Sequence, residues 1–206
     1  MHDEWEADSG ASYDVERDLE QRLRLATPQH TTRGILFKAT LKAVRDLGGT
    51  EDVVRQCVEA SGEKELLDFF SYPTSALLRL LAAAGRGLSS RYGSVEESLR
   101  QIGRMSGESY MDSAVGRSAQ LMTATDPKHW VGALQTIYKV VMPYGEPTVH
   151  WRGPRRSILA IQCAFTPLPY HEGGALAIAG RLGLKNVRAR ARPTGELSIE
   201  LDLSWE

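Results

Sequence analysis

The sequence predicts an α+β domain in which a helical N-terminal half packs on one face of a four-stranded antiparallel sheet. Three observations support this fold class. Helical periodicity and capping signals fill most of residues 34–142. Apolar segments at 146–165 and an alternating hairpin at 187–203 indicate strands, and a helix rich in small residues lies between them. The expected order at the C-terminal end is therefore strand–strand–helix–strand–strand.

Residues 1–30 are expected to form an acidic tail and linker, with at most a short amphipathic helix at 15–25, and residues 31–206 to form a single domain. The tail carries eight acidic residues against three arginines. Residues 150–195 have the opposite balance, with eight basic residues against one glutamate. We therefore expect the acidic segment to contact the basic region through an attraction that salt weakens.

Caps and breakers mark the helices of the N-terminal half. The helix that begins at Gly34 is stopped by Gly48-Gly49. Thr50 is suited to cap the next helix, and Ser94 opens a capping box at the start of a later one. A short helix is expected at 63–70, before a proline corner. The two cysteines, Cys57 and Cys163, are expected to be reduced thiols.

Small residues form a seam on the helix that follows Ser94, at Gly103, Ser106 and Gly107. The helix after Pro169 is similarly rich in glycine and alanine. Side chains of this size let two helix backbones approach closely. The pattern therefore favours close helix packing over a ligand slot.

The two hairpins differ in pattern. Residues 157–165 are apolar on both faces, which indicates a buried strand that ends at the prolines after Thr166. In the last hairpin, arginines alternate with alanines on one strand and acids with aliphatic residues on the other. Pairing apolar with apolar residues across a three-residue turn places Arg192 opposite Glu196 and Arg188 opposite Glu200. The basic stripe is then part of a charge ladder, and nucleic-acid binding is not expected.

No catalytic motif is recognisable, so no catalytic residue is assigned. The His171-Glu172 pair has no second histidine four residues on, so a zinc-protease site is excluded and no metal is expected. The longest apolar stretch is too short to span a bilayer. A cytoplasmic location is expected, with no cofactor. The candidate ligand-binding residues, chosen at corners, helix ends and the first hairpin, are Tyr72, Tyr138, Trp151, Arg155, Tyr170 and His171.

A family resemblance rests on several short segments. They are Thr32-Arg33-Gly34-Ile35-Leu36-Phe37, Phe70-Ser71-Tyr72-Pro73, Ile102-Gly103-Arg104, Val115-Gly116-Arg117 and Pro169-Tyr170-His171-Glu172-Gly173. With these segments, residues 30–205 resemble the paralogous domain of unknown function that is multiplied in myxobacteria. The resemblance implies a bacterial cytoplasmic protein and brings no established activity.

The order of elements is also similar to that of the heme nitric-oxide/oxygen binding domain and, in outline, to the four-vinyl-reductase ligand-sensing domain. The heme family uses an axial histidine and a Tyr-x-Ser-x-Arg clamp on the first hairpin. His129 lies in the corresponding region, and the hairpin reads Trp151-x-Gly153-x-Arg155 without either hydroxyl. We expect Trp130 to be buried and His129 to face solvent, which disfavours heme.

The function expected from these observations is a non-enzymatic module of bacterial signalling or regulation that binds a small molecule or a protein partner. Three alternatives remain. One is a heme-based gas sensor, another is an enzyme whose nucleophile and base are far apart in sequence, and the third is a structural protein or dimerisation module. A homodimer is a further expectation for the assembly.

Overall fold

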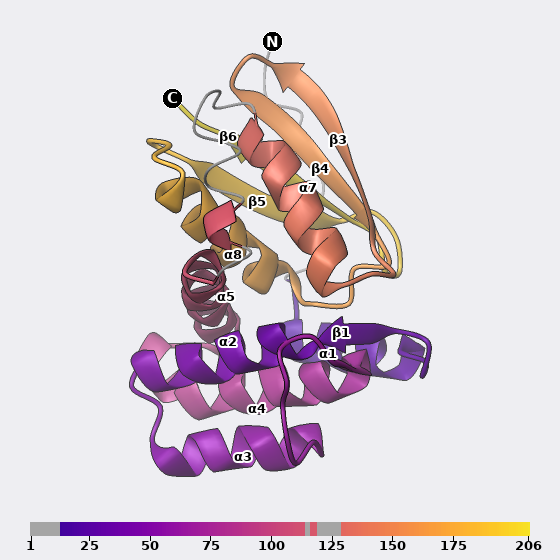
Figure 1. Cartoon of the computed structure of the whole chain (residues 1–206), viewed down its shortest axis with the longest axis vertical. Coiled ribbons are helices and arrows are strands. Elements are labelled where there is room, and N and C mark those ends of the chain that lie inside the picture. Colours follow the sequence, from indigo (N-terminus) through magenta and orange to yellow (C-terminus); the bar gives the residue numbers. More distant parts are fainter. Residues whose placement is uncertain (1–12, 114–115, 119–128) are drawn as a thin grey trace.

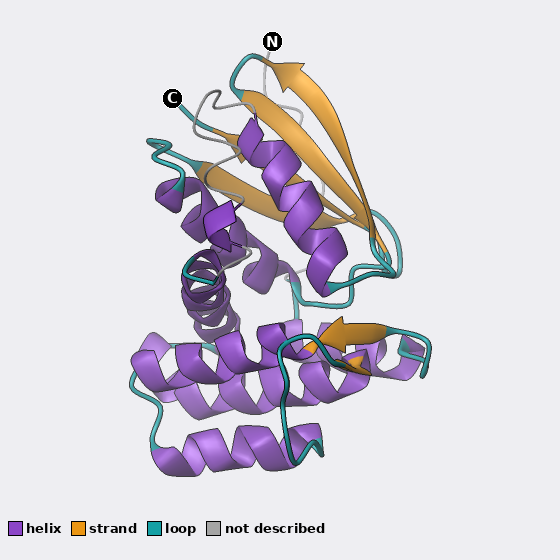
Figure 2. Cartoon of the chain, viewed as in Figure 1, coloured by secondary structure: helices purple, strands orange, loops and turns teal. Residues whose placement is uncertain are grey.

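The computed structural model describes residues 13–113, 116–118 and 129–206. Figure 1 shows the helices α1 to α4 gathered at one end of the molecule and the four-stranded sheet at the other, with α5 and α8 between them. Figure 2 shows the same division between helix and strand. The α+β prediction is confirmed.

The helices of the described residues begin and end largely where caps and breakers place them. Thr50 Oγ1 accepts from the amide of Val53 at 3.3 Å, and Ser94 Oγ accepts from the amide of Glu97 at 3.0 Å, as predicted. Gly62 ends α3 and Gly93 ends α4, both in the left-handed conformation. The helices are α1 (Val15–Leu25), α2 (Gly34–Asp46), α3 (Glu51–Ser61), α4 (Thr74–Tyr92), α5 (Val95–Met111), α7 (His129–Val141) and α8 (Leu168–Arg181). Asp126-Pro127, which the sequence predicts as the cap and first residue of the helix through Trp130, lies outside the described part of the chain.

The helix predicted at 63–70 is wrong. This segment is a loop whose carbonyls bind the first amides of α2: Gly34 N donates to Phe70 O at 2.9 Å, and Ile35 N donates to Asp68 O at 3.0 Å. The helix itself does not form because Leu67 N donates to the Tyr72 hydroxyl at 2.8 Å and Phe70 N donates to Leu67 O at 3.1 Å, so neither amide bonds the carbonyl four residues back. The loop leads into β2 (Ser71–Pro73), which pairs with β1 (Thr31–Arg33) in a two-stranded sheet that the sequence prediction treated as linker and corner.

The main sheet has the predicted four antiparallel strands, in the order β3 (Glu146–Gly153), β4 (Arg156–Gln162), β6 (Ile199–Ser204) and β5 (Arg188–Pro193). One face carries Leu159, Ile161 and Leu201, all buried, and α7 and α8 cover this face (Figure 1). β4 ends three residues earlier than predicted, because Cys163 has a φ of 55° and turns the chain toward α8.

The predicted register of the last hairpin is wrong by four residues. Arg192 pairs with Glu200, and Ala191 pairs with Leu201. The intervening loop is longer than three residues because Leu197 O accepts from Ala164 N at 2.7 Å and is held against the end of β4. A shift by an even number of residues keeps every side chain on its predicted face. The charge ladder therefore survives with other partners, and Arg192 Nη2 lies 2.6 Å from Glu200 Oε2.

Among the described elements, α5 and α8 make the most extensive contact with each other, and the predicted small-residue seam lies within this contact. A Cβ atom at Gly103 would lie 2.8 Å from Tyr170 Cα, and one at Gly173 would lie 2.7 Å from the backbone nitrogen of Arg104. Such distances are shorter than atomic contact. The two helices therefore approach so closely that only glycine fits at these positions.

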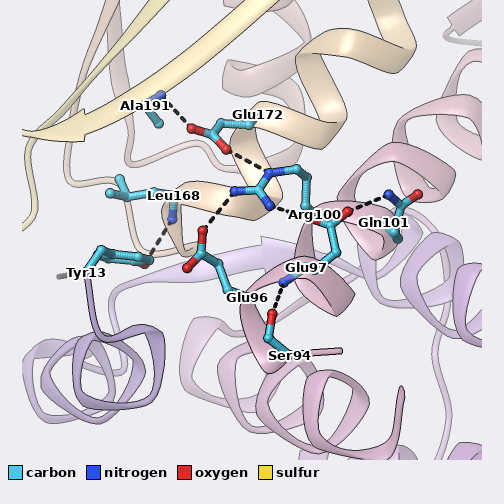
Figure 3. A network of polar contacts seen from close by, with 9 residues as sticks. All are labelled: Tyr13, Ser94, Glu96, Glu97, Arg100, Gln101, Leu168, Glu172 and Ala191. Carbon is cyan, nitrogen blue, oxygen red and sulfur yellow. Dashed lines mark hydrogen bonds and ion pairs between the residues drawn. The ribbon is translucent and has the colours of Figure 1, made fainter. Parts of the chain in front are cut away.

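An ionic network secures the same contact on its accessible side (Figure 3). Arg100 on α5 binds Glu96 at 2.9 Å, Glu97 in the same helix, and Glu172 on α8 at 3.0 Å. The other oxygen of Glu172 accepts from the amide of Ala191 at 2.9 Å. Glu172 thus joins α5 and α8 to the edge strand β5, and it accepts a hydrogen bond from a backbone amide of β5 that faces away from β6.

The helix α1 packs on the domain by burying Leu19 and Arg22. Arg22 Nε lies 2.6 Å from Asp18, and Arg22 also donates to the carbonyl of Ala164 in the corner after β4. Glu16 pairs with Arg86 on α4 at 2.6 Å. These two acids of α1 therefore pair outside residues 150–195, contrary to the expected contact with the basic region; residues 1–12 lie outside the described chain.

None of the described helices is both long enough and apolar enough to cross a membrane. Cys57 and Cys163 are both free thiols, as predicted.

Candidate functional site

An internal cavity of about 100 Å³ lies where α5, α7 and α8 meet the apolar face of the sheet. Each of these elements contributes side chains, and the corner after β4 adds Thr166. The glycines of the α5–α8 seam form part of one wall. The other lining residues are Leu36, Ser106, Tyr110, Leu134, Ile137, Tyr138, Val141, Met142, Leu159, Ile161, Tyr170, His171, Ala175, Ile178 and Leu201.

Two tyrosine hydroxyls in this lining are buried without a hydrogen-bond partner among the described residues. They belong to Tyr110 on α5 and Tyr138 on α7. Burial raises the pKa of Tyr110 to about 12 and raises the pKa of Tyr138 well above its usual value, so both phenols are neutral. A buried hydroxyl that lacks a partner costs about 1–3 kcal/mol. Both tyrosines line the cavity, and a side-chain rotation would bring either hydroxyl within reach of a guest molecule.

His171 on α8 brings an imidazole to the same wall. Its Nε2 lies 2.7 Å from Thr166 Oγ1, and its ring stacks on Tyr138 with 5.9 Å between the centroids. Burial, reinforced by the nearby positive charge of Arg22, lowers the pKa of His171 to about 3. The imidazole is therefore neutral at physiological pH.

Tyr170 completes the polar lining and is held by α2. Its hydroxyl lies 3.3 Å from Thr40 Oγ1, which itself donates to the carbonyl of Leu36 at 2.8 Å. Burial raises the pKa of Tyr170. The adjacent residues Tyr170 and His171 both reach the cavity from the first turn of α8.

Of the six candidate residues, the fold brings Tyr138, Tyr170 and His171 together and leaves the other three apart. The Tyr72 hydroxyl accepts from the amide of Leu67 at 2.8 Å, and the Tyr72 ring packs on Phe37. This tyrosine stabilises the loop before β2 and does not line the cavity.

Trp151 and Arg155 belong to the first hairpin, away from the cavity lining. Trp151 is half-exposed and meets Trp205 edge-on at 6.2 Å, and Arg155 is exposed. His129, the first residue of α7, is exposed, whereas Trp130 is buried, as predicted.

Tyr110 is the functional candidate that sequence reasoning missed. Its position was visible in the sequence, because Tyr110 follows Gly103, Ser106 and Gly107 at helical spacing and so shares their face. The sequence pattern favoured helix packing alone for this seam. In the structure Gly103 packs against the backbone of Tyr170, and Ser106, Gly107 and Tyr110 line the cavity.

Among the residues that the structure describes, no three histidine, cysteine or acidic side chains converge into a group that could hold a metal ion.

The architecture is similar to that of solved H-NOX structures. An H-NOX protein from S. oneidensis in the Fe(II)NO state matches with a TM-score of 0.63 and 14% identity, over 84% of this chain and 99% of that one. Unliganded Fe(II) H-NOX from K. algicida matches with a TM-score of 0.60 and 17% identity, over 84% and 96%. F78L Tt H-NOX gives 0.64 and 12%, over 84% and 95%. At these identities the likeness concerns the fold.

No curated protein sequence matches the chain. Residues 25–206, from the end of α1 to the C-terminus, match the family described as protein of unknown function (DUF2378), and the chain therefore belongs to that family.

Proposed function

We propose that this domain is a non-enzymatic sensor module that binds a small, largely apolar molecule in the cavity between α5, α7, α8 and the sheet. The observation that supports this function is the pair of buried hydroxyls of Tyr110 and Tyr138, which have no partner among the described residues. A guest that accepts a hydrogen bond from either hydroxyl after rotation of its ring would recover the free energy of an unsatisfied donor. Tyr138, Tyr170 and His171 are the proposed ligand contacts.

The size of the cavity limits the guest. About 100 Å³ is less than the roughly 150 Å³ that hold benzene in an engineered apolar cavity. A guest confined to the cavity would therefore have only a few non-hydrogen atoms. The apolar lining from α7 and β4 favours a hydrocarbon body over a charged one.

An enzymatic role finds little support in the same lining. Thr166 and His171 form a hydroxyl–imidazole pair at 2.7 Å, the arrangement that nucleophilic catalysis uses. A general base works best when its pKa lies near the working pH, and the pKa of His171 is about 3. The pair therefore serves orientation and not proton abstraction.

Heme-based gas sensing is the second candidate, because the fold is similar to that of H-NOX proteins solved in Fe(II) and Fe(II)NO states. The residues present do not fit a heme. His129 faces solvent, the Nε2 of His171 is engaged by Thr166, and a cavity of about 100 Å³ is below the roughly 300–1,000 Å³ of ligand sites. Titration with hemin tests this point, and we expect no Soret band that depends on His129.

The experiment for the main proposal is native mass spectrometry of the purified protein, which reports a co-purified ligand and the oligomeric state together. The Ala175→Leu variant, which fills the cavity from α8, should lose the bound mass, and Gly180→Ala on the same helix should keep it. Retention of the ligand by the filled variant would place the binding site elsewhere. We further propose that the protein is cytoplasmic and of myxobacterial origin, as the family resemblance implies.

A further inference from the structure

A surface pocket of about 370 Å³ lies beside the internal cavity. Its walls come from the start of α2 (Ile35), the 62–70 loop (Phe69) and the end of α7 (Val140). Tyr110 lines both the surface pocket and the cavity, so its side chain lies between the two.

The Tyr110 side chain is placed to control passage between the surface pocket and the internal cavity. It is only 4% exposed, yet its hydroxyl finds no hydrogen-bond partner among the residues described. A packed tyrosine usually satisfies its hydroxyl, so this position is costly unless a ligand completes it. A rotation of this one side chain would join the two spaces, whose combined volume lies within the roughly 300–1,000 Å³ of small-molecule sites.

The rim of the surface pocket is apolar and exposed. Phe69, which is 75% exposed, and the half-exposed Val140 line it, and Leu67 and Phe70 are exposed apolar residues of the same loop as Phe69. Large apolar side chains grouped on a surface mark sites where a ligand or partner binds. The pocket thus continues the apolar character of the cavity out to solvent.

The charge of the surface pocket is positive. Arg33 and the exposed Lys139 line it, together with Asp68, which is neutralised by Lys38 at 2.7 Å. One terminal nitrogen of Arg33 holds Phe69 O and Ser71 Oγ, each at 2.9 Å, and the guanidinium carries further N–H donors. An anionic group would therefore be favoured at this mouth.

We propose that the two spaces form one binding site for an aliphatic carboxylate, with its charged end at Arg33 and Lys139 and its hydrocarbon chain passing Tyr110 into the cavity. This inference rests on the proposed ligand-binding function and names the ligand class and the route by which the ligand enters. Binding would fix the 62–70 loop against α7, which gives a sensor a structural change to transmit.

The test is calorimetric titration of the full chain with decanoate below its micelle concentration, and with decanol as the uncharged analogue. Lys139→Gln should weaken decanoate binding about tenfold and leave decanol binding unchanged. Lys64→Gln removes the same charge from an exposed position outside the pocket and should change neither. Val140→Glu, another surface substitution, should weaken both by introducing a charge into the apolar wall.

Two further variants separate this inference from the proposed function. Ala175→Leu should weaken decanoate binding by filling the inner part of the site, and Tyr110→Phe should weaken it less because the ring remains. If decanoate affinity is unchanged in Lys139→Gln and Val140→Glu while Ala175→Leu still loses a co-purified ligand, that result refutes the joined site and supports binding in the internal cavity alone. If Lys139→Gln acts but Ala175→Leu does not, the ligand stays at the surface, and the joined site is again refuted.

Discussion

The α5–α8 seam allows a sharp test, because the same substitution should have opposite effects at two helical glycines. Gly103 faces α8, and Gly132 on α7 has no atom within 4 Å of the Cβ position. In a helix interior, alanine is favoured over glycine by about 0.5–1 kcal/mol. Gly132→Ala should therefore stabilise the domain by about that amount.

At Gly103 the same gain in helix propensity is opposed by a steric clash with α8. The new methyl group would overlap the carbonyl oxygen of Tyr170 and lie 2.8 Å from its Cα. These are backbone atoms of a helix that Glu172 ties to both Arg100 and β5, so α8 cannot shift without loosening that network. Overpacking of this kind costs about 1–3 kcal/mol and at times more. Because both obstacles are backbone atoms, the upper end of this range applies, about 3 kcal/mol, and the expected net loss is about 2 kcal/mol once the helical gain is subtracted.

Urea unfolding followed by circular dichroism measures both variants on one scale. For a domain of this size, about 2 kcal/mol corresponds to a decrease of about 4–8 °C in Tm. The two alanine variants should differ by about 3 kcal/mol in the free energy of unfolding, with wild type between them. Equal stabilities for Gly103→Ala and Gly132→Ala would falsify the close approach of α5 and α8.

Four other expectations concern pH, register, backbone strain and charge. The unfolding free energy should fall by about 2 kcal/mol from pH 7.5 to pH 5, because His171 titrates near 6.5 when unfolded and near 3 when folded; the loss begins below pH 6.5. His171→Gln should flatten this part of the profile, and His129→Gln should not. A double-mutant cycle on Arg192 and Glu200 should give a coupling of up to about 1 kcal/mol, larger than that of the cycle on Arg192 and Glu196; the reverse order would restore the shorter turn. Cys163→Gly should stabilise the domain by about 1 kcal/mol because Cys163 has a φ of 55°, whereas Cys163→Ala should not; equal effects would exclude strain there. Deleting residues 1–12, which carry four acids and no lysine or arginine, should raise retention on a polyanion column, and unchanged retention would end that expectation.

Much of the fold could be predicted because local chemistry decides it. The caps at Thr50 and Ser94 satisfy amides within three residues, and the alternation in β5 and β6 fixes which face each side chain occupies. The pairing register of β5 and β6, in contrast, depends on a hydrogen bond to a distant part of the chain. Leu197 is held by the amide of Ala164, more than thirty residues away, and a turn rule cannot include that bond.

The helix predicted at 63–70 is wrong because contacts outside the helical pattern take its amides. Its composition permits a helix, but Leu67 N donates to the Tyr72 hydroxyl and Phe70 N to Leu67 O, in place of the carbonyls four residues back. Three of the six candidate residues, Tyr138, Tyr170 and His171, line one cavity, and the other three lie away from it. Sequence cannot separate the two sets, because an aromatic residue beside a corner can equally well hold a loop, as Tyr72 does through Leu67.

The glycines of the seam explain why close packing and the proposed binding site share one helix pair. At Gly103 the α5 backbone approaches α8 so closely that no side chain fits between them. At Tyr110, two turns further along α5, a large side chain stands where the cavity meets the surface pocket. Close contact at one end fixes the position of α8, and with it Tyr170 and His171, relative to that tyrosine. A ligand that moves Tyr110 would then act against a rigid support, and the displacement would pass to the 62–70 loop and α7 rather than dissipate within the core.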